Sequence, residues 1–250
     1  MKNILITGSN GFIGKNLKNR LKQYDDIKIY EFNRYDNIND IENYINKIDF
    51  IFHLAGEVRP DSSDEKFKAS HGVLTQKLVD IIENHKLAIP ILLSSSKHAQ
   101  NPKNSYGQTK KDTEDIIINY SKQNNTAVYI YRLSHLFGEE CKPNYNSVIS
   151  TWIYNSIKNL PINIYDRNID MRYLYVQDVV NDFIKNIYKN NDGQIHWCDI
   201  EEQYDTTLGE VVDYINDFKD NINNQNYKID SNIFKKKLFD VYLDYIKFYG

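Results

Sequence analysis

A tyrosine and a lysine that lie four residues apart, Tyr106 and Lys110, form the most chemically specific pair in the chain. Four residues make about one helical turn, so both side chains are expected on one helix face with the ammonium near the phenol. A unit charge ~4 Å away in an effective dielectric of ~20 is worth roughly 4 kcal/mol, which predicts that the pKa of the phenol falls by at most about three units. Such a tyrosine could donate and accept protons near neutral pH.

A run of three serines precedes this pair. Ser94, Ser95 and Ser96 follow an apolar stretch at Ile89–Leu93, and Tyr106 comes ten residues after Ser96. A serine hydroxyl at the end of that expected strand would hold a substrate oxygen in line with the phenol. Because a YxxxK spacing is common by chance, this interpretation depends on the serine run and on a glycine-rich segment near the amino terminus.

The glycine-rich segment is TGSNGFIG at 7–14, between an expected first strand and first helix. Backbone N–H groups and the helix dipole at such a place can receive the pyrophosphate of a dinucleotide. Gly8 would allow a tight turn, Gly11 the close passage of phosphate oxygens, and Gly14 the packing of helix against strand. The spacing is GxxGxxG rather than GxGxxG, and an ordinary strand-to-helix turn is the alternative. Its position in the first βα unit favours a nucleotide.

The end of the second expected strand bears on which nicotinamide dinucleotide would bind. An acidic residue there accepts hydrogen bonds from the ribose 2′-OH of NAD, whereas an arginine accommodates the 2′-phosphate of NADP. The residues present are Glu31, Phe32, Asn33 and Arg34. If strand alternation turns Glu31 away from the ribose, Arg34 is the available head group, and NADP(H) is favoured over NAD(H). A solvated loop cation is the alternative for Arg34.

Short apolar runs alternate with segments of helical period in the first half of the chain. This alternation predicts right-handed βαβ units and an α/β fold with a Rossmann-type doubly wound parallel sheet. The expected strands are Ile4–Ile6, Ile27–Phe32, Phe50–Leu54, Ile89–Leu93 and Val128–Tyr131, and the expected helices are Phe12–Gln23, Ile41–Ile48, Gly72–His85 and Thr109–Gln123.

The alternation loosens after Gly138, which predicts a small C-terminal substrate-binding lobe. We expect one unit over 1–250, with a dinucleotide-binding core at about 1–138 and with about 139–250 forming mostly the lobe, including interleaved returns to the core. The elements expected in the second half are a helix at Val148–Ile157, a β-like run at Ile162–Ile164, and helices at Leu208–Phe218 and Ile233–Phe248.

Composition excludes several classes of protein. Hydrophobic residues make up 41% of the 250, and the charged residues nearly cancel to a net charge of −3, so neither a disordered tail nor a nucleic-acid partner is expected. No stretch approaches the ~18 apolar residues of a membrane span, and no signal peptide is recognised before the first strand. Cys141 and Cys198 are expected to be free thiols, and the histidines show no ligand spacing. The prediction is a metal-free cytoplasmic protein.

Over nearly its whole length the sequence resembles the extended short-chain dehydrogenase/reductase family of nucleotide-sugar epimerases, dehydratases and reductases. The motifs that carry this resemblance are TGSNGFIG at 7–14, HLAG at 53–56, LLSSS at 92–96, SYGQTK at 105–110, RLSHLFG at 132–138 and RYLYVQDV at 172–179. The resemblance implies a catalytic trio of Ser96, Tyr106 and Lys110, with Ser95 as the alternative serine. It also implies that Arg172 binds the diphosphate of a UDP- or dTDP-sugar.

Together with the arguments above for the glycines and Arg34, the same resemblance implies a set of cofactor-binding residues. They are Gly8, Asn10, Gly11, Phe12, Ile13, Gly14, Arg34, Leu54, Ala55, Gly56, Tyr106, Lys110 and Leu133.

A more specific resemblance is to the reductase half of the CapF-type capsule and O-antigen enzymes, which reduce UDP-4-keto-6-deoxy-N-acetylhexosamines. It rests on GEVRP at 56–60, VYIYRLSHLFGEECKPNYNSVI at 128–149 and LFDVYLDYI at 238–246. Such enzymes usually continue into a cupin domain credited with epimerisation at C3, which this sequence does not include. The epimerase could be a separate protein, the chain could be a domain of a longer one, or no epimerisation is needed.

Two departures from the family pattern are informative. His135 stands where the family commonly has an asparagine near the sugar, and a packed or solvated histidine is the alternative. Lys97 and His98 follow the serines where 4,6-dehydratases have an Asp-Glu pair, which argues against dehydration. The candidate substrate ligands are Arg59, His135, Lys142, Asn144, Asn146 and Arg172. For Arg59 and for the three residues at 142, 144 and 146, a surface-loop role is the alternative.

The resemblance implies NADPH-dependent reduction of the C4 ketone of a UDP-4-keto-6-deoxy-N-acetylhexosamine, with Tyr106 as the proton donor. One alternative is a nucleotide-sugar 4-epimerase with bound NAD, and another is a non-catalytic NADP-binding sensor or scaffold. An upstream 4,6-dehydratase and a separate C3 epimerase are the expected pathway partners. Family analogy also suggests a homodimer formed through helices of the Rossmann unit.

Overall fold

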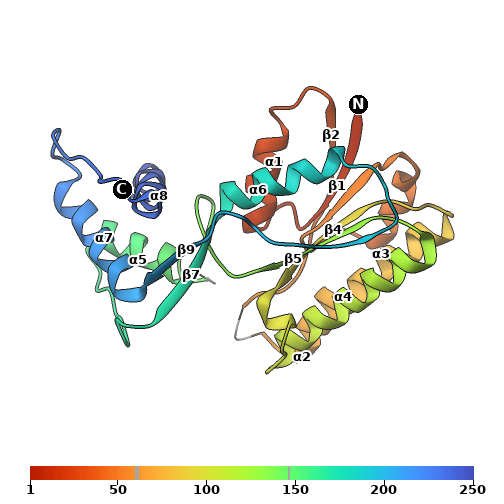
Figure 1. The fold of residues 1–250 in the computed structure, drawn as a ribbon, viewed down its shortest axis with the longest axis horizontal. Coiled ribbons are helices and arrows are strands. Elements are labelled where there is room, and N and C mark those ends of the chain that lie inside the picture. Colours follow the sequence, from red (N-terminus) through yellow and green to blue (C-terminus); the bar gives the residue numbers. More distant parts are fainter. Residues whose placement is uncertain (60–61, 146) are drawn as a thin grey trace. The chain divides into compact units, whose positions relative to one another are not determined.

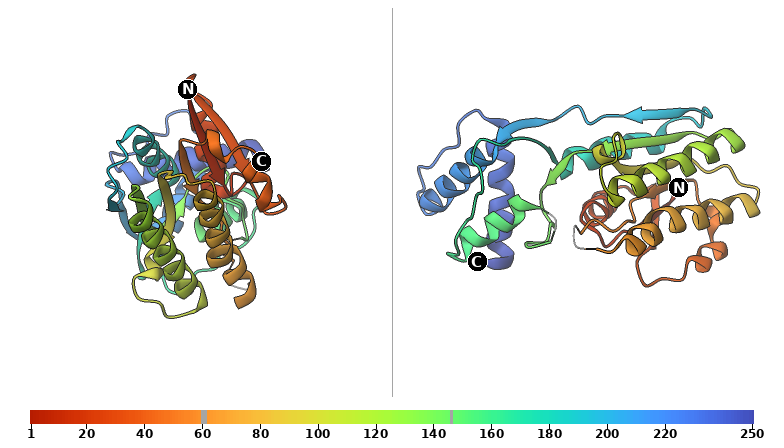
Figure 2. Two further views of the ribbon diagram at one scale, coloured as in Figure 1. Left: turned by 90° about the vertical axis from the view of Figure 1, so that its right-hand side faces the viewer. Right: turned by 90° about the horizontal axis from the view of Figure 1, so that it is seen from below.

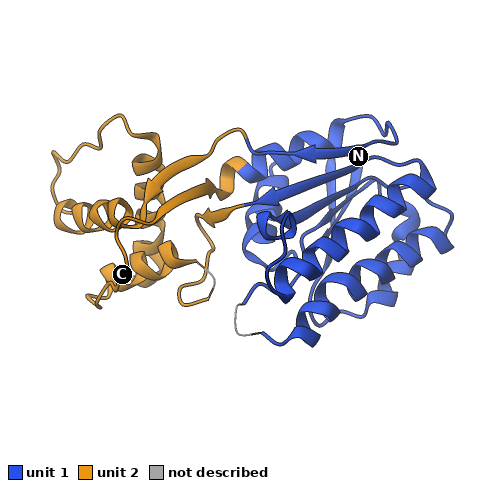
Figure 3. Ribbon diagram, turned by 60° about the horizontal axis from the view of Figure 1, so that its bottom comes forward, with its two compact units in different colours: residues 1–133, 179–200 blue, residues 134–178, 201–250 orange. Residues whose placement is uncertain are grey.

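The computed structural model describes residues 1–59, 62–145 and 147–250. The chain forms two compact units. Unit 1 comprises 1–133 and 179–200, and unit 2 comprises 134–178 and 201–250 (Figure 3). Each unit has its own sheet, and the two are described in turn. Within the described residues, no helix combines the length and the apolar character that a membrane span requires.

Unit 1 is built on a parallel sheet of six strands in the order β2-β1-β3-β4-β5-β8. The chain runs from β1 outward to β2 and then returns past β1 to β3, so the direction of winding reverses between β1 and β3. The doubly wound α/β class is therefore confirmed, and ligands of such sheets bind outside the carboxyl ends of the strands at this reversal. The strands are β1 (Lys2–Thr7), β2 (Ile27–Phe32), β3 (Phe50–His53), β4 (Ile91–Ser96), β5 (Val128–Leu133) and β8 (Ile195–Cys198).

Helices cover both faces of this sheet. Helices α3 and α4 lie on one face, and α1 and α6 lie on the other (Figure 1). Figure 2 shows α3 and α4 side by side. The bounds are α1 (Phe12–Leu21), α2 (Asp64–Lys68), α3 (Leu74–Asn84), α4 (Ser105–Asn124) and α6 (Val176–Lys185), with a π-helical turn η3 (Ala69–Val73) between α2 and α3 and 3-10 turns η1 (Ile38–Asn43), η2 (Ile45–Lys47), η4 (Lys97–Ala99) and η5 (Asn186–Tyr188).

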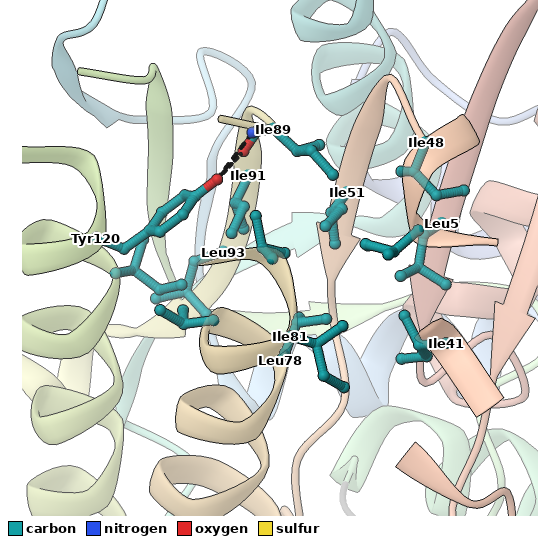
Figure 4. Packing of buried hydrophobic residues seen from close by; sticks show 14 of the residues in the cluster. Leu5, Ile41, Ile48, Ile51, Leu78, Ile81, Ile89, Ile91, Leu93 and Tyr120 are labelled. Carbon is teal, nitrogen blue, oxygen red and sulfur yellow. Dashed lines mark hydrogen bonds between the residues drawn. The ribbon is translucent and has the colours of Figure 1, made fainter. Parts of the chain in front are cut away.

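The two faces of the sheet have separate cores, because successive side chains of a strand point to opposite sides. Leu5 and Ile51 pack toward α3, where Leu78 joins the same buried cluster (Figure 4). On the other face the ring of Phe52 stacks with that of Phe183 from α6, with ring centroids 6.2 Å apart. The strands are apolar on both sides for this reason, as a parallel sheet covered by helices requires.

The α-helix expected at 41–48 is wrong, since η1 and η2 occupy this stretch as two short 3-10 turns. Ile41 and Ile45 are fully buried, as their spacing predicts. Tyr44 has a φ of −137° and separates the two turns. The spacing of the apolar residues thus predicted which side chains are buried, but it did not predict the hydrogen-bond pattern of the backbone.

Unit 2 has a three-stranded sheet in the order β6-β7-β9, with β6 parallel and β9 antiparallel to β7. The helices expected at 148–157, 208–218 and 233–248 are all present. The run expected at 162–164 is not a strand, and β6, β7, β8, β9 and α6 were not predicted. The strands are short and mix exposed with buried residues. Helix α6, by contrast, has buried apolar residues at regular helical spacing, and this signal was overlooked. The elements are β6 (His135–Phe137), β7 (Asp170–Tyr175), β9 (Tyr204–Thr207), α5 (Val148–Ile157), α7 (Leu208–Asn221) and α8 (Ile233–Tyr249).

We predict that Tyr120→Phe destabilises unit 1. The Tyr120 hydroxyl donates to the carbonyl of Ile89 and accepts from its N–H, both at 2.8 Å, in a buried position (Figure 4). Removing it leaves two buried backbone groups unpaired, which should lower the free energy of unfolding by about 1–3 kcal/mol in urea denaturation. Tyr35→Phe is the control, because Tyr35 is 95% exposed. Equal stability of the two variants would contradict the prediction.

Candidate functional site

The glycine-rich segment lies at the carboxyl end of β1, against the turn that follows β3. Gly8 has a φ of +73°, a left-handed conformation that glycine adopts without strain. A Cβ on Gly8 would lie 2.9 Å from the Cα of Ala55. The tight turn expected at Gly8 is present, and it brings the loop next to Leu54 and Ala55, which were expected to bind the cofactor.

Gly11 and Gly14 shape the start of α1. A Cβ on Gly14 would collide with the carbonyl oxygen of Gly8, whereas one on Gly11 would meet only that oxygen, at 3.1 Å. The outer side of the loop is therefore open. Helix α1 has no side-chain cap and no acidic residue in its first turn, so the N–H groups of Phe12 and Ile13 lie at an uncompensated positive end of the helix dipole. This cradle fits the pyrophosphate of a dinucleotide.

Glu31 at the end of β2 is directed to the glycine-rich loop and not away from it. Its carboxylate accepts a hydrogen bond of 2.6 Å from Ser9 Oγ and one of 2.9 Å from the ammonium of Lys18. The argument for Arg34 as the only side chain available to the ribose required Glu31 to point away, and this requirement is not met. Asn33 adds a second link, because its side-chain oxygen accepts the N–H of Asn10 at 2.9 Å.

Arg34 itself forms an ion pair with the carboxylate of Glu57 at 2.9 Å. The Arg34 side chain is 54% exposed, while that of Glu57 is 3% exposed. Arg59, a predicted substrate ligand, also contacts Glu57, with Nε at 3.4 Å from the carboxylate. The two arginines thus share one buried carboxylate, which holds both guanidinium groups near the turn after β3.

Ser96 is the serine that faces Tyr106. It ends β4, pairs in register with Leu133 at the end of β5, and its hydroxyl accepts the N–H of His98. The predicted fall in the pKa of Tyr106 is wrong: burial raises the pKa of this phenol, and the nearby Ser96 hydroxyl offsets this only in part. Tyr106 therefore remains a protonated donor at neutral pH.

Lys110 is buried, with 6% exposure, and its ammonium donates to the carbonyl of Ser94 at 2.9 Å. Burial lowers the pKa of Lys110 to about 8, while the charge of Glu114 acts in the opposite direction. The lysine is thus directed to the end of β4 and to the interior of unit 1. Its charge is lost at a pH only slightly above neutrality.

Glu114 was missed as part of the site. It is fully buried four residues after Lys110, and its carboxylate accepts Nε and Nη2 of Arg132 at 2.9 and 2.8 Å. Ser95 donates to the same carboxylate at 2.6 Å, so this serine is engaged away from Tyr106 and the alternative to Ser96 is disfavoured. The i, i+4 spacing from Lys110 to Glu114 is the sequence signal that could have indicated this residue.

Two buried histidines were also missed. His53 ends β3, and its Nδ1 and Nε2 lie 2.8 Å from the hydroxyls of Thr7 and Thr75. Burial, together with the charge of Lys110, lowers the pKa of His53 to about 3. His71 in η3 is 1% exposed and contacts the ring of Tyr106 edge to face, with centroids 5.8 Å apart. Both imidazoles are neutral at physiological pH.

Most of the predicted substrate ligands belong to unit 2. His135, at the start of β6, and Lys142 are exposed, and Asn144 has a φ of +55° with its N–H bonded to Thr151. Arg172 on β7 is paired bidentately with Asp205 on β9, with contacts of 2.6 and 2.8 Å. A diphosphate would have to compete with this carboxylate.

Asn146 lies outside the described residues. Within the described part of the chain, no group of three or more His, Cys, Asp or Glu side chains is arranged to hold a metal ion.

Comparison with known proteins places these features in a family. Residues 4–197 match the "NAD dependent epimerase/dehydratase family". The chain is 34% identical over 219 residues to "UDP-2-acetamido-2,6-beta-L-arabino-hexul-4-ose reductase" of Pseudomonas aeruginosa, covering 86% of this chain and 57% of the relative.

Solved structures agree with this comparison. The "capsular polysaccharide assembling protein CapF" of Staphylococcus aureus matches with a TM-score of 0.85 and 36% identity, over 98% of this chain and 66% of that protein. The chain thus spans less than two thirds of the length of these two relatives. The Bordetella bronchiseptica enzyme WbmF, solved with NAD+, matches with a TM-score of 0.80 over 97% of this chain and 92% of that one; at 17% identity it shows the fold alone.

The resemblance that the motifs indicated is confirmed. The family match at 4–197 covers well over half of the chain and includes the glycine-rich loop, the Ser96 strand end and the Tyr106 helix, and the reductase relative matches 86% of the chain. The chain belongs to the NAD dependent epimerase/dehydratase family.

Proposed function

We propose that the protein reduces the C4 ketone of a UDP-4-keto-6-deoxy-N-acetylhexosamine with a nicotinamide dinucleotide as reductant. The observation that carries this proposal is the placement of Ser96, Tyr106 and Lys110 at the carboxyl end of one sheet that also bears the open glycine cradle. The name of the 34% identical relative, a hexul-4-ose reductase, supports the class of substrate.

Each residue of the trio has a separate task in this reaction. Ser96 Oγ donates a hydrogen bond to the ketone oxygen and aligns it with the phenol. Tyr106 delivers its proton to that oxygen as negative charge develops on it, and burial keeps the phenol protonated until then. The dinucleotide, when bound, supplies the hydride that reduces the ketone carbon. The Lys110 ammonium, one helical turn from Tyr106, would bind the nicotinamide ribose of the dinucleotide.

Dehydration is a weaker candidate. Lys97 and His98 begin the turn η4 directly after Ser96, and neither supplies the carboxyl groups with which the Asp-Glu pair of 4,6-dehydratases eliminates water. Upstream 4,6-dehydration and a separate C3 epimerisation would supply the substrate. A homodimer of the protein in the cytoplasm completes the proposal.

NADPH is the reductant that we propose, on the basis of Arg34. Although Glu31 faces the loop, its charge is already compensated by Lys18 at 2.9 Å, so it opposes a 2′-phosphate less than a free carboxylate would. Arg34 is half exposed and could turn from Glu57 toward a phosphate while Arg59 keeps its contact with that carboxylate.

Replacing Tyr106 with phenylalanine tests the reaction itself. Tyr106→Phe should lower kcat for NADPH oxidation with an enzymatically made UDP-4-keto-6-deoxy-N-acetylhexosamine by about 10²–10⁴-fold, because the proton donor is lost. The dissociation constant of NADPH should stay within about twofold, since the ring is retained. Wild-type protein that carries NAD through purification and consumes no NADPH would instead indicate a 4-epimerase. Wild-type protein that binds NADPH but turns over neither reaction would indicate a sensor.

Replacing Arg34 with alanine tests the cofactor. Arg34→Ala should reduce the ratio of kcat/KM for NADPH to that for NADH by about three- to tenfold, because a partly exposed charge-assisted contact to the 2′-phosphate is removed. Arg20→Ala, at the far end of α1, is the matched control. A wild-type preference for NADH, or a ratio that Arg34→Ala does not change, would refute the NADPH proposal.

The pH profile tests Lys110. The pKa of Lys110 is about 8, so the ammonium is present below pH 8 and is lost as the pH rises through that value. We expect kcat/KM for the reduction to be flat near neutrality and to fall above about pH 8. In Lys110→Arg, whose guanidinium stays charged, the remaining activity should lack this alkaline limb. An unchanged limb in that variant would assign it to another group.

A further inference from the structure

A buried tyrosine of α8 holds the loop of unit 2 that carries the predicted substrate ligand Lys142. Tyr245 is 2% exposed, and its hydroxyl donates to the carbonyl oxygen of Cys141. A carbonyl oxygen can only accept, so the direction of this hydrogen bond is fixed. The carbonyl belongs to the peptide group that joins Cys141 to Lys142. The contact therefore fixes the backbone at the point where the Lys142 side chain begins.

Helix α5 holds the next residues of the same loop. The carbonyl oxygen of Lys142 lies 3.2 Å from Ser150 Oγ, and the N–H of Asn144 donates to Thr151 Oγ1 at 2.9 Å. Between these two contacts the ring of Pro143 restricts φ. Asn144 has a φ of +55°, a left-handed conformation that asparagine adopts more readily than most residues. The backbone on both sides of Lys142 is thus fixed.

The side chains of Lys142 and Asn144, unlike their backbone, are uncommitted. Both residues are exposed. Among the residues that the structure describes, neither the Lys142 ammonium nor the Asn144 side-chain amide has a hydrogen-bond or ion-pair partner. Arg172 differs in this respect, because its guanidinium is already paired with Asp205. Lys142 is therefore the predicted substrate ligand whose positive charge is available without the loss of an ion pair.

The chemistry of these two side chains selects an anion rich in oxygen atoms. The ammonium offers three N–H donors and no acceptor, and the amide of Asn144 offers two more donors. A diphosphate supplies several acceptor oxygens together with negative charge, so its hydrogen bonds to the ammonium are charge-assisted. A backbone that is fixed before binding also reduces the entropy that is lost when the ligand binds.

We propose that Tyr245 is a positioning residue for the nucleotide-sugar substrate, since its hydrogen bond to Cys141 sets the backbone from which Lys142 reaches the substrate's diphosphate. The inference rests on the proposed function, which makes a UDP-sugar the substrate. Tyr245 acts through Lys142 and does not touch the substrate, because its proton is used by the Cys141 carbonyl. Tyr245 lies in the string at 238–246 and Cys141 in the string at 128–149, so two strings that carry the more specific resemblance meet at this hydrogen bond.

Tyr242, three residues earlier on α8, provides a matched control. It is also 2% exposed, and its hydroxyl lies 3.1 Å from Ser156 Oγ on α5. Tyr245→Phe and Tyr242→Phe each remove one buried hydroxyl from the same helix, but only the first hydroxyl contacts the loop. A purely structural role for Tyr245 therefore predicts the same binding constants for both variants.

The test measures kcat and KM for the keto sugar, and the dissociation constants of UDP and NADPH by calorimetry. In Tyr245→Phe, the KM and the dissociation constant of UDP should each rise about three- to tenfold, because Lys142 is no longer held in place. The kcat should stay within about twofold, since the lost interaction concerns binding and not the reacting atoms. NADPH binding should not change, because the glycine cradle belongs to unit 1. Tyr242→Phe should leave all four constants within about twofold of the wild type.

Lys142→Met shows whether Tyr245 acts through the lysine. This substitution removes the ammonium from an exposed position, so folding is not at risk, and the dissociation constant of UDP should rise about tenfold. Adding Tyr245→Phe to Lys142→Met should then have little further effect, because the positioned group is already absent. Effects that multiply in the double variant would overturn the inference. So would UDP binding that is insensitive to Lys142→Met, or equal UDP constants for Tyr245→Phe and Tyr242→Phe.

The UDP measurements separate failure of the inference from failure of the proposed function. A wild type that binds UDP through Lys142 and Tyr245 but reduces no keto sugar would refute the reductase proposal and support this inference. A wild type that reduces the keto sugar, with a KM and a UDP constant insensitive to both residues, would do the reverse.

Discussion

The burial of one ammonium group, that of Lys110, organises the site of unit 1. A charged amine with 6% exposure is tolerated only where polar groups compensate it. The Ser94 carbonyl supplies one contact, and the buried carboxylate of Glu114 supplies an opposite charge nearby. Glu114 is in turn neutralised by Arg132 at 2.8 Å. This arrangement fixes the end of β4 relative to α4, and with it the positions of Ser96 and Tyr106.

The same charge affects its neighbours. Beyond the effect of burial, it disfavours protonation of His53 and His71, so both rings act through fixed hydrogen bonds to threonines. His53 joins Thr7 at the glycine-rich loop to Thr75 on α3, and His71 joins Thr109 on α4. The loop, the turn after β3 and helix α4 are therefore held by buried neutral contacts, which do not change over the physiological pH range.

The elements of unit 1 were largely predictable from sequence because each obeys a local rule. Parallel strands covered on both faces are apolar throughout, and Gly8 and Gly14 mark a turn that no other residue fits. Prediction was poor where the local signal was weak or shared by two structures. The spacing of Ile41 and Ile45 suits an α-helix, but two 3-10 turns separated at Tyr44 bury both residues instead. The short strands of unit 2 mix exposed and buried residues.

By itself the sequence determined the fold class, the glycine cradle and the pairing of Tyr106 with Lys110, since each depends on residues close together in the chain. Only the tertiary structure determined how deeply these groups are buried and which groups they contact. Burial raises the pKa of Tyr106 where one nearby charge had suggested a fall, and Glu31 is directed to Ser9. The tertiary structure also brought His71 beside Lys110. Solvent exclusion and contacts between distant segments set these properties, and neither is encoded in the spacing of residues along the chain.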